Sequence, residues 1–300
     1  MRVVVVGMGV QGAKRIAVAG SDVVATVDPV QDGADYKQLA EVPTGSFDAA
    51  LLCVPDAVKL PLMRSLVEQG KHFLVEKPVL ADHDEAIRDL VGLAGQSGSI
   101  CYTAYNHRFE PHFMRMKALI KSGELGRIYA VRLFYGNGTA RLVRNSPWRD
   151  QGAGVLSDLG SHLLDTIHFW IGVPDAPFTV AAATRFENNS PDYAVITSFG
   201  TISIQLEMTL LSWRNHFTCD VFAENGSAHI ESLCKWGPSV FRHRRRVLPS
   251  GRPPEDCVTL VQDDPTWAAE YEHFKSLCRG GGGNLANDLW INSTLRALSS

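Results

Sequence analysis

Short apolar runs alternate with amphipathic segments over the first third of the chain. Strand-like runs without strict polar alternation occur at residues 2–7, 22–28, 47–54, 72–78 and 100–105. Helix-like periodicity occurs between them, at residues 10–20, 57–70 and 82–98. Such runs are typical of strands buried on both faces, and strand-helix-strand order implies right-handed crossovers. The pattern predicts a doubly wound parallel α/β sheet.

The pattern changes after Tyr105. A helix, a long strand, an arginine-rich loop, a second helix and several strands are expected next, the regular elements at residues 111–123, 127–138, 158–171 and within 178–262. Consecutive strands joined by short Asn, Gly and Pro turns favour an open, mostly antiparallel sheet, so this half is predicted to be α+β. We therefore expect two domains, residues 1–105 and 106–300.

The end of the chain combines a glycine run with a helical pattern. Gly280–Gly283 precede an amphipathic stretch at residues 287–300. Four consecutive glycines are interpreted as a flexible joint before a closing helix.

The composition and net charge limit the kinds of molecule that the protein is expected to bind. Of the 300 residues, 45% are hydrophobic and 20% are charged, and the formal net charge is -3. These values are typical of a globular protein with an ordinary core. Because this charge offers no general attraction to phosphate backbones or anionic lipids, neither nucleic acid nor a membrane is an expected partner.

The apolar runs and the cysteines indicate a compartment. Val3–Val6 are too few for the core of a signal peptide, and no later run approaches the roughly 18 apolar residues of a membrane span. The six cysteines lie far apart without a CxxC pair, as expected of reduced thiols. The sequence predicts a cytoplasmic protein.

A glycine motif follows the first predicted strand and opens the first helix. It reads Gly7-Met8-Gly9-Val10-Gln11-Gly12. Glycines at this spacing permit a tight turn, the approach of a pyrophosphate to backbone N–H groups and close packing of the helix on the strand. The motif predicts a dinucleotide site, and its alternative is a glycine turn in a domain that binds no nucleotide.

The second predicted strand ends in Asp28. A carboxylate at this place can accept hydrogen bonds from ribose hydroxyls and would repel a 2′-phosphate. Pro29 and Val30 follow it, with no adjacent arginine to hold a phosphate. NAD is therefore the expected cofactor and NADP is disfavoured, while the alternative is that Asp28 is an ordinary surface residue.

Glu76-Lys77-Pro78 ends the fourth predicted strand. This position lies on the carboxyl edge of the predicted sheet, where ligands of open α/β folds bind. In the dinucleotide interpretation, the same edge holds the nicotinamide end of the cofactor. A solvated Glu-Lys pair is the common alternative for two such neighbours.

Residues 151–170 contain a second polar cluster. Read as a helix from Val155, the segment places Asp158 and His162 on one face, with Asp165 three residues further. An imidazole with a pKa near neutrality, oriented by neighbouring groups, suits a general base for a secondary alcohol. The alternatives are a polar cluster on a helix face, or a metal site with His168, which is disfavoured because no second ligand cluster is evident.

Two segments are rich in arginine. The loop that contains Arg141, Arg144, Trp148 and Arg149 could bind a carboxylate or phosphate of a substrate, or expose its arginines to water. The basic run at residues 241–247 is interpreted as a solvated hairpin, with a phosphate-bearing partner as the less favoured reading.

Together these segments resemble the glucose-fructose oxidoreductase, inositol dehydrogenase and rhizopine catabolism (Gfo/Idh/MocA) family of NAD(P)-dependent oxidoreductases. The resemblance covers the glycine motif with Asp28 and then residues 54–78, 106–111, 147–165 and 287–298. It implies an N-terminal Rossmann domain and a C-terminal α+β domain that binds substrate. It also implies a homo-oligomer, a dimer or tetramer, because the open sheet of this family commonly packs in oligomers.

The resemblance further implies roles for individual residues. Lys77, Asp158 and His162 match the catalytic lysine, aspartate and histidine of the family. His162 would take the hydroxyl proton as hydride leaves the same carbon, Lys77 would stabilise the developing alkoxide, and Asp158 would bind a neighbouring hydroxyl. No metal is needed, because Lys77 supplies the positive charge. The expected cofactor-binding residues are Gly7, Gly9, Val10, Gln11, Gly12, Asp28, Pro55, Glu76 and Lys77. The expected substrate-binding residues are Asn106, Arg108, Trp148, Arg149, Asp158 and His162.

The chain departs from the family pattern at two places and in its length. Lys59 stands where the family often has a histidine, and Gly152-Ala153-Gly154 replaces a run of glycines before the catalytic helix. Lys59 is expected to affect packing on the cofactor side more than chemistry. Three hundred residues are few for this family, so loops that shape the substrate pocket could be shortened.

The function predicted from the sequence is an NAD(P)-dependent dehydrogenase or reductase. It would transfer a hydride between nicotinamide and a secondary alcohol or ketone of a sugar, cyclitol or sugar derivative. Two alternatives remain: a non-catalytic sensor that binds a dinucleotide, and a glycosidase that oxidises its substrate transiently and returns NAD unchanged.

Overall fold

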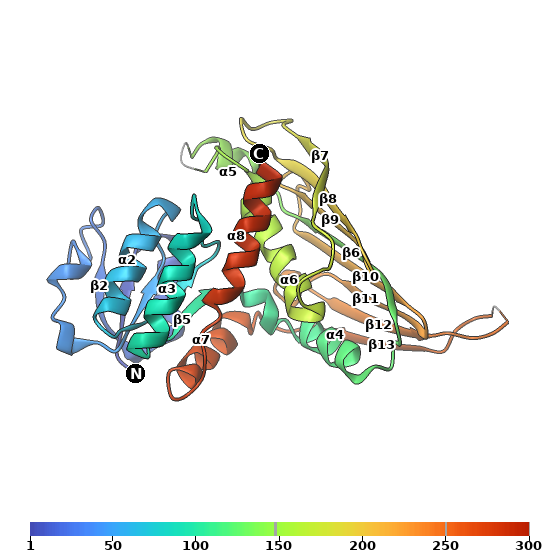
Figure 1. Cartoon of the computed structure of the whole chain (residues 1–300), viewed down its shortest axis with the longest axis horizontal. Coiled ribbons are helices and arrows are strands. Elements are labelled where there is room, and N and C mark those ends of the chain that lie inside the picture. Colours follow the sequence, from blue (N-terminus) through green and yellow to red (C-terminus); the bar gives the residue numbers. More distant parts are fainter. Residues whose placement is uncertain (147–148, 250, 300) are drawn as a thin grey trace. The chain divides into compact units, whose positions relative to one another are not determined.

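The computed structural model describes residues 1–146, 149–249 and 251–299 of the chain. It divides into two compact units (Figure 1). Unit 1 consists of residues 1–106 and 266–293, and unit 2 of residues 107–265 and 294–300. The expected domains, 1–105 and 106–300, differ from this division because a C-terminal segment belongs with the first unit.

Unit 1 is built on a parallel sheet of five strands. They are β1 (Val3–Val6), β2 (Val23–Val27), β3 (Ala49–Leu52), β4 (His72–Glu76) and β5 (Cys101–Ala104), in the order β2-β1-β3-β4-β5. All residues of β1, β3 and β5 are buried, as expected of strands covered on both faces. Chain order reverses between β1 and β3, which is where doubly wound sheets bind ligands at the carboxyl edge.

Helices cover both faces of this sheet. On one face, α1 (Val10–Ala19) and α7 (Thr266–Leu277) supply Ala19, Tyr271 and Phe274 to a core shared with the strands. On the other, α2 (Asp56–Glu68) and α3 (Asp84–Ser97) pack with a separate set of strand side chains. Short 3-10 turns complete the unit at Gly20–Asp22, Leu39–Glu41, Thr44–Ser46 and Asn106–Phe109. Helix α7 was not predicted from the sequence.

The segment after α7 docks on the edge strand β5. The amide of Asn284 donates to the carbonyl oxygen of Thr103 (2.9 Å) and accepts from its N–H (2.6 Å), as a neighbouring strand would. A Cβ on Gly283 would lie 2.2 Å from the carbonyl oxygen of Cys101. The glycine run, expected to be a flexible joint, therefore allows a close backbone approach before α8 (Leu285–Ser299) begins.

Unit 2 is built on a sheet of eight strands. They are β6 (Ile128–Gly136), β7 (Thr179–Thr184), β8 (Tyr193–Phe199), β9 (Ser203–Thr209), β10 (His216–Ala223), β11 (Gly226–Glu231), β12 (Ser239–Arg245) and β13 (Glu255–Leu260). The order is β13-β12-β11-β10-β6-β9-β8-β7, and every neighbouring pair is antiparallel except β6 with β9. The mostly antiparallel sheet predicted from the sequence is confirmed.

Two helices lie on one face of this sheet, α4 (Pro111–Ser122) and α6 (Ser161–Ile171) (Figure 1). Phe113 of α4 packs against Trp170 and against Phe217 of the sheet, with ring centroids 5.0 and 5.1 Å apart. The shorter elements of the unit are α5 (Ala140–Arg144), a π-helical turn η5 (Leu156–Gly160) and a 3-10 turn η6 (Cys234–Trp236). Across the described ranges of the chain, no helix combines the length and apolar character needed to cross a membrane.

The basic run at residues 241–247 lies mainly on β12, which forms a hairpin with β13. Its arginines face carboxylates: Arg242 pairs with Glu231 (2.9 Å), and Arg244 pairs with Glu255 (2.6 Å). Arg245 contacts both Glu124 and Asp256. Carboxylates on neighbouring segments thus neutralise these arginines, in agreement with the hairpin interpretation.

Candidate active site

The three glycines of the first βα junction serve different geometric needs. Gly7 has φ +90°, and a Cβ there would lie 2.4 Å from the carbonyl oxygen of Cys53. A Cβ on Gly12 would lie 1.8 Å from the carbonyl oxygen of Gly7, so α1 can approach β1 this closely only with glycine. A Cβ on Gly9 would meet no atom within 4 Å, so the backbone there faces open space.

The start of α1 completes this junction. Gly9 precedes the helix and has no side chain that could cap it, so first-turn N–H groups can be offered to an anion. Val10 and Gln11, both predicted to bind cofactor, are exposed in that first turn. The observed glycine geometry therefore fits a dinucleotide pyrophosphate.

Asp28 lies just after β2, beside the glycine turn. One carboxylate oxygen accepts the N–H of Met8 (2.8 Å), and the other accepts those of Val30 (2.9 Å) and Gln31 (3.0 Å). Burial alone would raise the pKa of Asp28, but these backbone donors outweigh it and lower the pKa. The carboxylate is therefore charged at neutral pH and organises the turn, and its remaining lone pairs suit ribose hydroxyls.

Glu76, at the end of β4, belongs to a buried charge network. It accepts a hydrogen bond from Arg15 Nε (2.8 Å), while Arg15 Nη2 donates to Glu270 of α7 (2.7 Å). Only 1% of the Arg15 side chain is exposed, and its guanidinium lies 4.3 Å from the ring centre of Trp267. Glu76 was predicted as a cofactor-binding residue, and the structure gives it this intramolecular partner.

Lys77 follows Glu76 on the carboxyl edge of the sheet. Pro55, another predicted cofactor residue, is exposed on the same edge, between β3 and α2. The glycine turn, Asp28, Pro55 and Lys77 all lie after the ends of parallel strands, so unit 1 gathers the predicted cofactor residues at one edge.

In unit 2, His162 lies in the first turn of α6 and is 7% exposed. Its ring stacks on that of His107, with centroids 4.1 Å apart and planes inclined by 18°. Tyr135 of β6 meets His162 edge-on, with centroids 5.9 Å apart. Burial, followed by the charges of Asp158 and Glu110, raises the pKa of Tyr135, so its hydroxyl stays protonated.

Lys235 connects this stack to an open cavity. Its Nζ lies 3.2 Å from His107 Nε2. Because an ammonium can only donate, His107 Nε2 accepts and its proton lies on Nδ1. The cavity has a volume of about 480 Å³ and is lined by Cys234, Lys235, Gly237, Val261, Gln262, Asp263 and Asp264.

Sequence reasoning missed His107, Tyr135 and Lys235 as members of this cluster. His107 lies in the segment at residues 106–111 that resembles the family, but the resemblance implies substrate contacts for its neighbours Asn106 and Arg108. Tyr135 follows the alternation of an ordinary buried strand, and Lys235 lies in a short turn. Nothing in their local patterns distinguished these two residues.

The helix that carries Asp158 begins at Val155, as the sequence predicts. Its first turn, Leu156–Gly160, is of the π type, and the regular α-helix follows from Ser161. The charge of Asp158 acts on Tyr135, whose ring meets that of His162 edge-on. The joint role of Asp158 and His162 stays a prediction.

The arginine before this turn approaches Asp158. Arg149 Nη2 lies 3.5 Å from Asp158 Oδ2, and each side chain is 34% exposed. Two predicted substrate residues thus meet within unit 2. Trp148, a third, lies outside the described residues.

The other two predicted substrate residues have intramolecular partners. Arg108 donates from Nε to Asp165 Oδ2 (2.8 Å) and from Nη2 to Asp165 Oδ1, and Asp165 is 1% exposed. Asn106 donates to Thr266 Oγ1 (2.8 Å). These contacts explain how both residues contribute to the packing of their own units.

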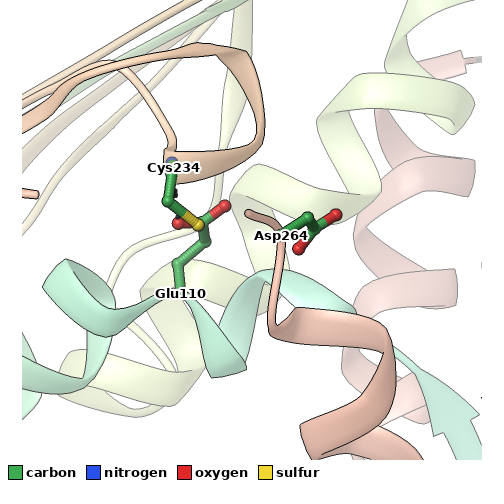
Figure 2. Close-up of side chains that lie close together, drawn as sticks. All are labelled: Glu110, Cys234 and Asp264. Carbon is green, nitrogen blue, oxygen red and sulfur yellow. Dashed lines mark hydrogen bonds between the residues drawn. The ribbon is translucent and has the colours of Figure 1, made fainter. Parts of the chain in front are cut away.

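Figure 2 shows a cluster that the sequence did not suggest, made of Glu110, Cys234 and Asp264. Their donor atoms lie within 4.8 Å of one another. Glu110 accepts the N–H of Cys234 (3.2 Å), and burial raises the pKa of Glu110. Burial and the neighbouring Glu110 raise the pKa of the Cys234 thiol to about 12. A protonated thiol beside a carboxylate accounts for this grouping by hydrogen bonding.

Comparison with known proteins supports both halves of the fold. Residues 1–105 match the model of the oxidoreductase family with an NAD-binding Rossmann fold, and residues 113–229 match the GFO/IDH/MocA C-terminal domain. The fold is also that of levoglucosan dehydrogenase in complex with NADH, with a TM-score of 0.84 at 17% identity, covering 99% of this chain and 95% of that one.

Two relatives illustrate the sequence similarity. The scyllo-inositol 2-dehydrogenase (NADP(+)) IolW of Bacillus subtilis (strain 168) is 27% identical over 76% of this chain and 60% of its own length. The inositol 2-dehydrogenase of Rhizobium meliloti (strain 1021) is 26% identical over 58% of this chain and 48% of its own length. The chain spans about half the length of the curated relatives it matches. With both of its halves matched by models of one family, the chain belongs to the Gfo/Idh/MocA family of oxidoreductases, whose N-terminal domain is an NAD-binding Rossmann fold.

Proposed function

We propose that the protein is an NAD-dependent dehydrogenase or reductase. It transfers a hydride between nicotinamide and a secondary alcohol or ketone of a sugar, cyclitol or sugar derivative. The observation that carries this proposal is the carboxyl edge of the unit 1 sheet, which presents the glycine turn, Asp28 and Lys77 together.

The proposed chemistry divides a hydride and a proton between different groups. A dinucleotide held by the glycine turn and Asp28 would supply the hydride acceptor for the carbon that carries the hydroxyl. His162 takes the hydroxyl proton as the C–O bond becomes a carbonyl. Lys77 donates a hydrogen bond to the same oxygen and stabilises its negative charge, and Asp158 binds a neighbouring hydroxyl. In the reverse direction, His162 returns the proton to the carbonyl oxygen.

The surroundings of His162 suit this role. The ring is buried against His107 and Tyr135, which hold its plane in place. His107 accepts the hydrogen bond of Lys235 through Nε2, which fixes the ring that stacks on His162. These contacts support an imidazole held in one orientation, as a general base requires.

The cavity beside Lys235 supports a polyhydroxylated substrate. Its lining alternates a donor, Lys235, with acceptors, Asp263 and Asp264, and an amide, Gln262. Hydroxyl groups both donate and accept, so each can be satisfied by such a mixed surface. The names of the inositol and levoglucosan dehydrogenases among the similar proteins agree with this substrate class.

NAD is proposed over NADP because of the charge of Asp28. Its lowered pKa keeps the carboxylate ionised where a 2′-phosphate would have to lie. Lys37 is a cation whose charge lowers the pKa of Asp28. Its Nζ donates to the carbonyl oxygen of Gln31 (2.9 Å) and lies 3.9 Å from Asp32. The Lys37 ammonium thus has partners in the turn after Asp28 and is not a free cation for a 2′-phosphate.

Self-association through the sheet of unit 2 is part of the proposal. The face of the sheet opposite the buried residues carries both apolar and polar side chains, including Phe134 of β6, Val195 of β8 and the His229–Asp220 pair (2.7 Å). A second copy could cover such a surface. Light scattering should give a dimer or tetramer mass, and a monomer at all concentrations would exclude this part.

The first test is a 340 nm absorbance screen with NAD, and separately NADP, against inositols, aldoses, sugar acids and nucleotide sugars. A rise with one compound establishes the reaction, the cofactor and the substrate family. Silence together with calorimetric NAD binding points to the sensor. Cleavage of a glycoside without accumulation of NADH points to the redox-neutral glycosidase.

Substitution of the two central residues tests their roles. Lys77→Ala and His162→Ala should each lower kcat by about 10²- to 10⁴-fold, because one removes charge stabilisation and the other the general base. The calorimetric Kd for NAD should stay within about threefold of wild type, since uniform binding is retained. The controls are Lys121→Ala and His216→Ala, both exposed, which should leave kcat unchanged. Undiminished turnover in both test variants would contradict the assignment.

A further inference from the structure

A buried lysine lies directly behind the segment that carries Lys77. Lys59, in the first half of α2, is 3% exposed. Its Nζ donates to the carbonyl oxygen of Pro78 at 2.7 Å and pairs with Asp56 at 2.6 Å. Asp56 itself is 43% exposed, so only the cationic partner of this pair is enclosed.

An ammonium is a costly group to bury at this position. Burial lowers the pKa of Lys59, and the charge of Asp56 opposes this effect only in part. The charge of Lys77 lowers the pKa of Lys59 further, because the two ammonium groups repel each other. A methionine of similar length would fill the same space without either penalty. The feature that a methionine could not supply is the hydrogen bond to Pro78.

The segment is also held from its other end. Glu76 binds Arg15, which is anchored to Glu270. Lys77 lies between two anchored residues, Glu76 on one side and Pro78 on the other. Its backbone is therefore fixed on the N-terminal side by a carboxylate and on the C-terminal side by the carbonyl that Lys59 binds.

We propose that Lys59 is a positioning residue for Lys77, because its ammonium holds the Pro78 carbonyl and so sets the direction in which the Lys77 side chain leaves the sheet edge. This role rests on the proposed function, in which Lys77 binds the reacting oxygen. In this role Lys59 acts through Lys77 rather than on the substrate. The sequence, by contrast, predicted an effect on cofactor-side packing more than on chemistry.

The test compares Lys59→Met with Lys71→Met. Lys71 is a matched control, since its Nζ also donates to a backbone carbonyl in unit 1, that of Phe47, at 2.7 Å. Lys59→Met should lower kcat by about 10- to 100-fold, the effect of a displacement near 1 Å at a reacting group. Kd for NAD should change less than about threefold. Hydrogen exchange of the peptide covering residues 74–82 should accelerate in Lys59→Met and stay at the wild-type rate in Lys71→Met.

Two further variants separate positioning from a loss of folding. Lys59→Gln keeps a donor without the charge and should recover part of the lost kcat and of the exchange protection. Asp56→Asn keeps the Lys59 side chain as the donor to the Pro78 carbonyl, so kcat should stay within about threefold of wild type. If Lys59→Met does not fold, the kcat and exchange rates of Lys59→Gln and Asp56→Asn test the positioning role instead.

The outcomes distinguish this proposal from the one it rests on. Wild-type kcat and wild-type exchange in Lys59→Met would overturn the positioning role, and so would a large loss of kcat in Asp56→Asn, which keeps the hydrogen bond to Pro78. A wild-type protein that turns over no substrate would overturn the proposed function, while faster exchange in Lys59→Met would still support the placement of the segment. Equal losses in Lys59→Met and Lys71→Met would show a general effect on the fold and would also overturn positioning.

Discussion

Asp150 shows how one carboxylate can hold a loop. It is 7% exposed, and its two oxygens accept four hydrogen bonds from the N–H and side-chain groups of Asn189 and Ser190, at 2.8 to 3.0 Å. Burial by itself would raise its pKa, but the four donors outweigh it and lower the pKa. The ionised form is therefore the one that the fold stabilises.

The effect of Asp150→Asn should depend on pH. A folded-state pKa below the unfolded value of about 3.9 contributes stability above that value, and this contribution disappears as pH falls through the folded pKa. At pH 7 the variant should lose about 2 kcal/mol of unfolding free energy. Urea denaturation should show this difference shrinking below about pH 4. Asp89→Asn, at an exposed position, is the control, and a pH-independent difference would contradict the argument.

The elements differ in how well sequence pattern describes them. Strands β1, β3 and β5 follow apolar runs because all their residues are buried, while the edge strand β2 leaves Val24 exposed. The π turn at Leu156–Gly160 has no such signal in the sequence. A Cβ on Gly160 would lie 3.0 Å from the sulfur of Met208, so the turn packs closely against the sheet. Local propensity carries no information on a contact with a strand so distant in sequence.

The docking of the glycine run on β5 predicts unequal effects of two adjacent substitutions. Gly283→Ala places a Cβ 2.2 Å from the Cys101 carbonyl oxygen, and backbone there cannot yield cheaply. We expect a loss of about 1–3 kcal/mol of unfolding free energy. Gly282→Ala meets no atom within 4 Å and should be neutral or slightly stabilising. Thermal unfolding of both variants checks this, and equal melting temperatures would show that the close approach is not maintained.

For the whole molecule, the sequence predicted the two sheets and the family but not how the chain is shared between the units. Residues 266–293 were placed in the second domain because α7 was not predicted and the glycines after it suggested a break. The glycine motif and Asp28 could be predicted from the sequence because their residues lie close together along the chain. His107, Tyr135 and Lys235 were not, because their grouping around His162 arises from strands and turns far apart in the sequence.

A fragment of residues 1–106 should therefore fail to form a stable unit. Without α7 it would expose the face lined by Val3, Val5, Leu74 and Tyr102, which Tyr271 and Phe274 cover. It would also leave the guanidinium of Arg15 without Glu270. We expect no cooperative thermal transition and at least a tenfold weaker Kd for NAD than the full chain by calorimetry. A cooperative transition with the full-chain Kd would contradict this.

The contact between Arg15 and Glu270 has a consequence for synthesis on the ribosome. The two residues are 255 positions apart, and chain growth at about 5–20 residues per second separates their appearance by about 10–50 s. During that interval a nascent chain carries a cation and an apolar sheet face whose partners have not yet been made. The strands of unit 1 are thus translated well before the helix that completes their packing, and a holding chaperone would find its binding surface on that uncovered side of the sheet.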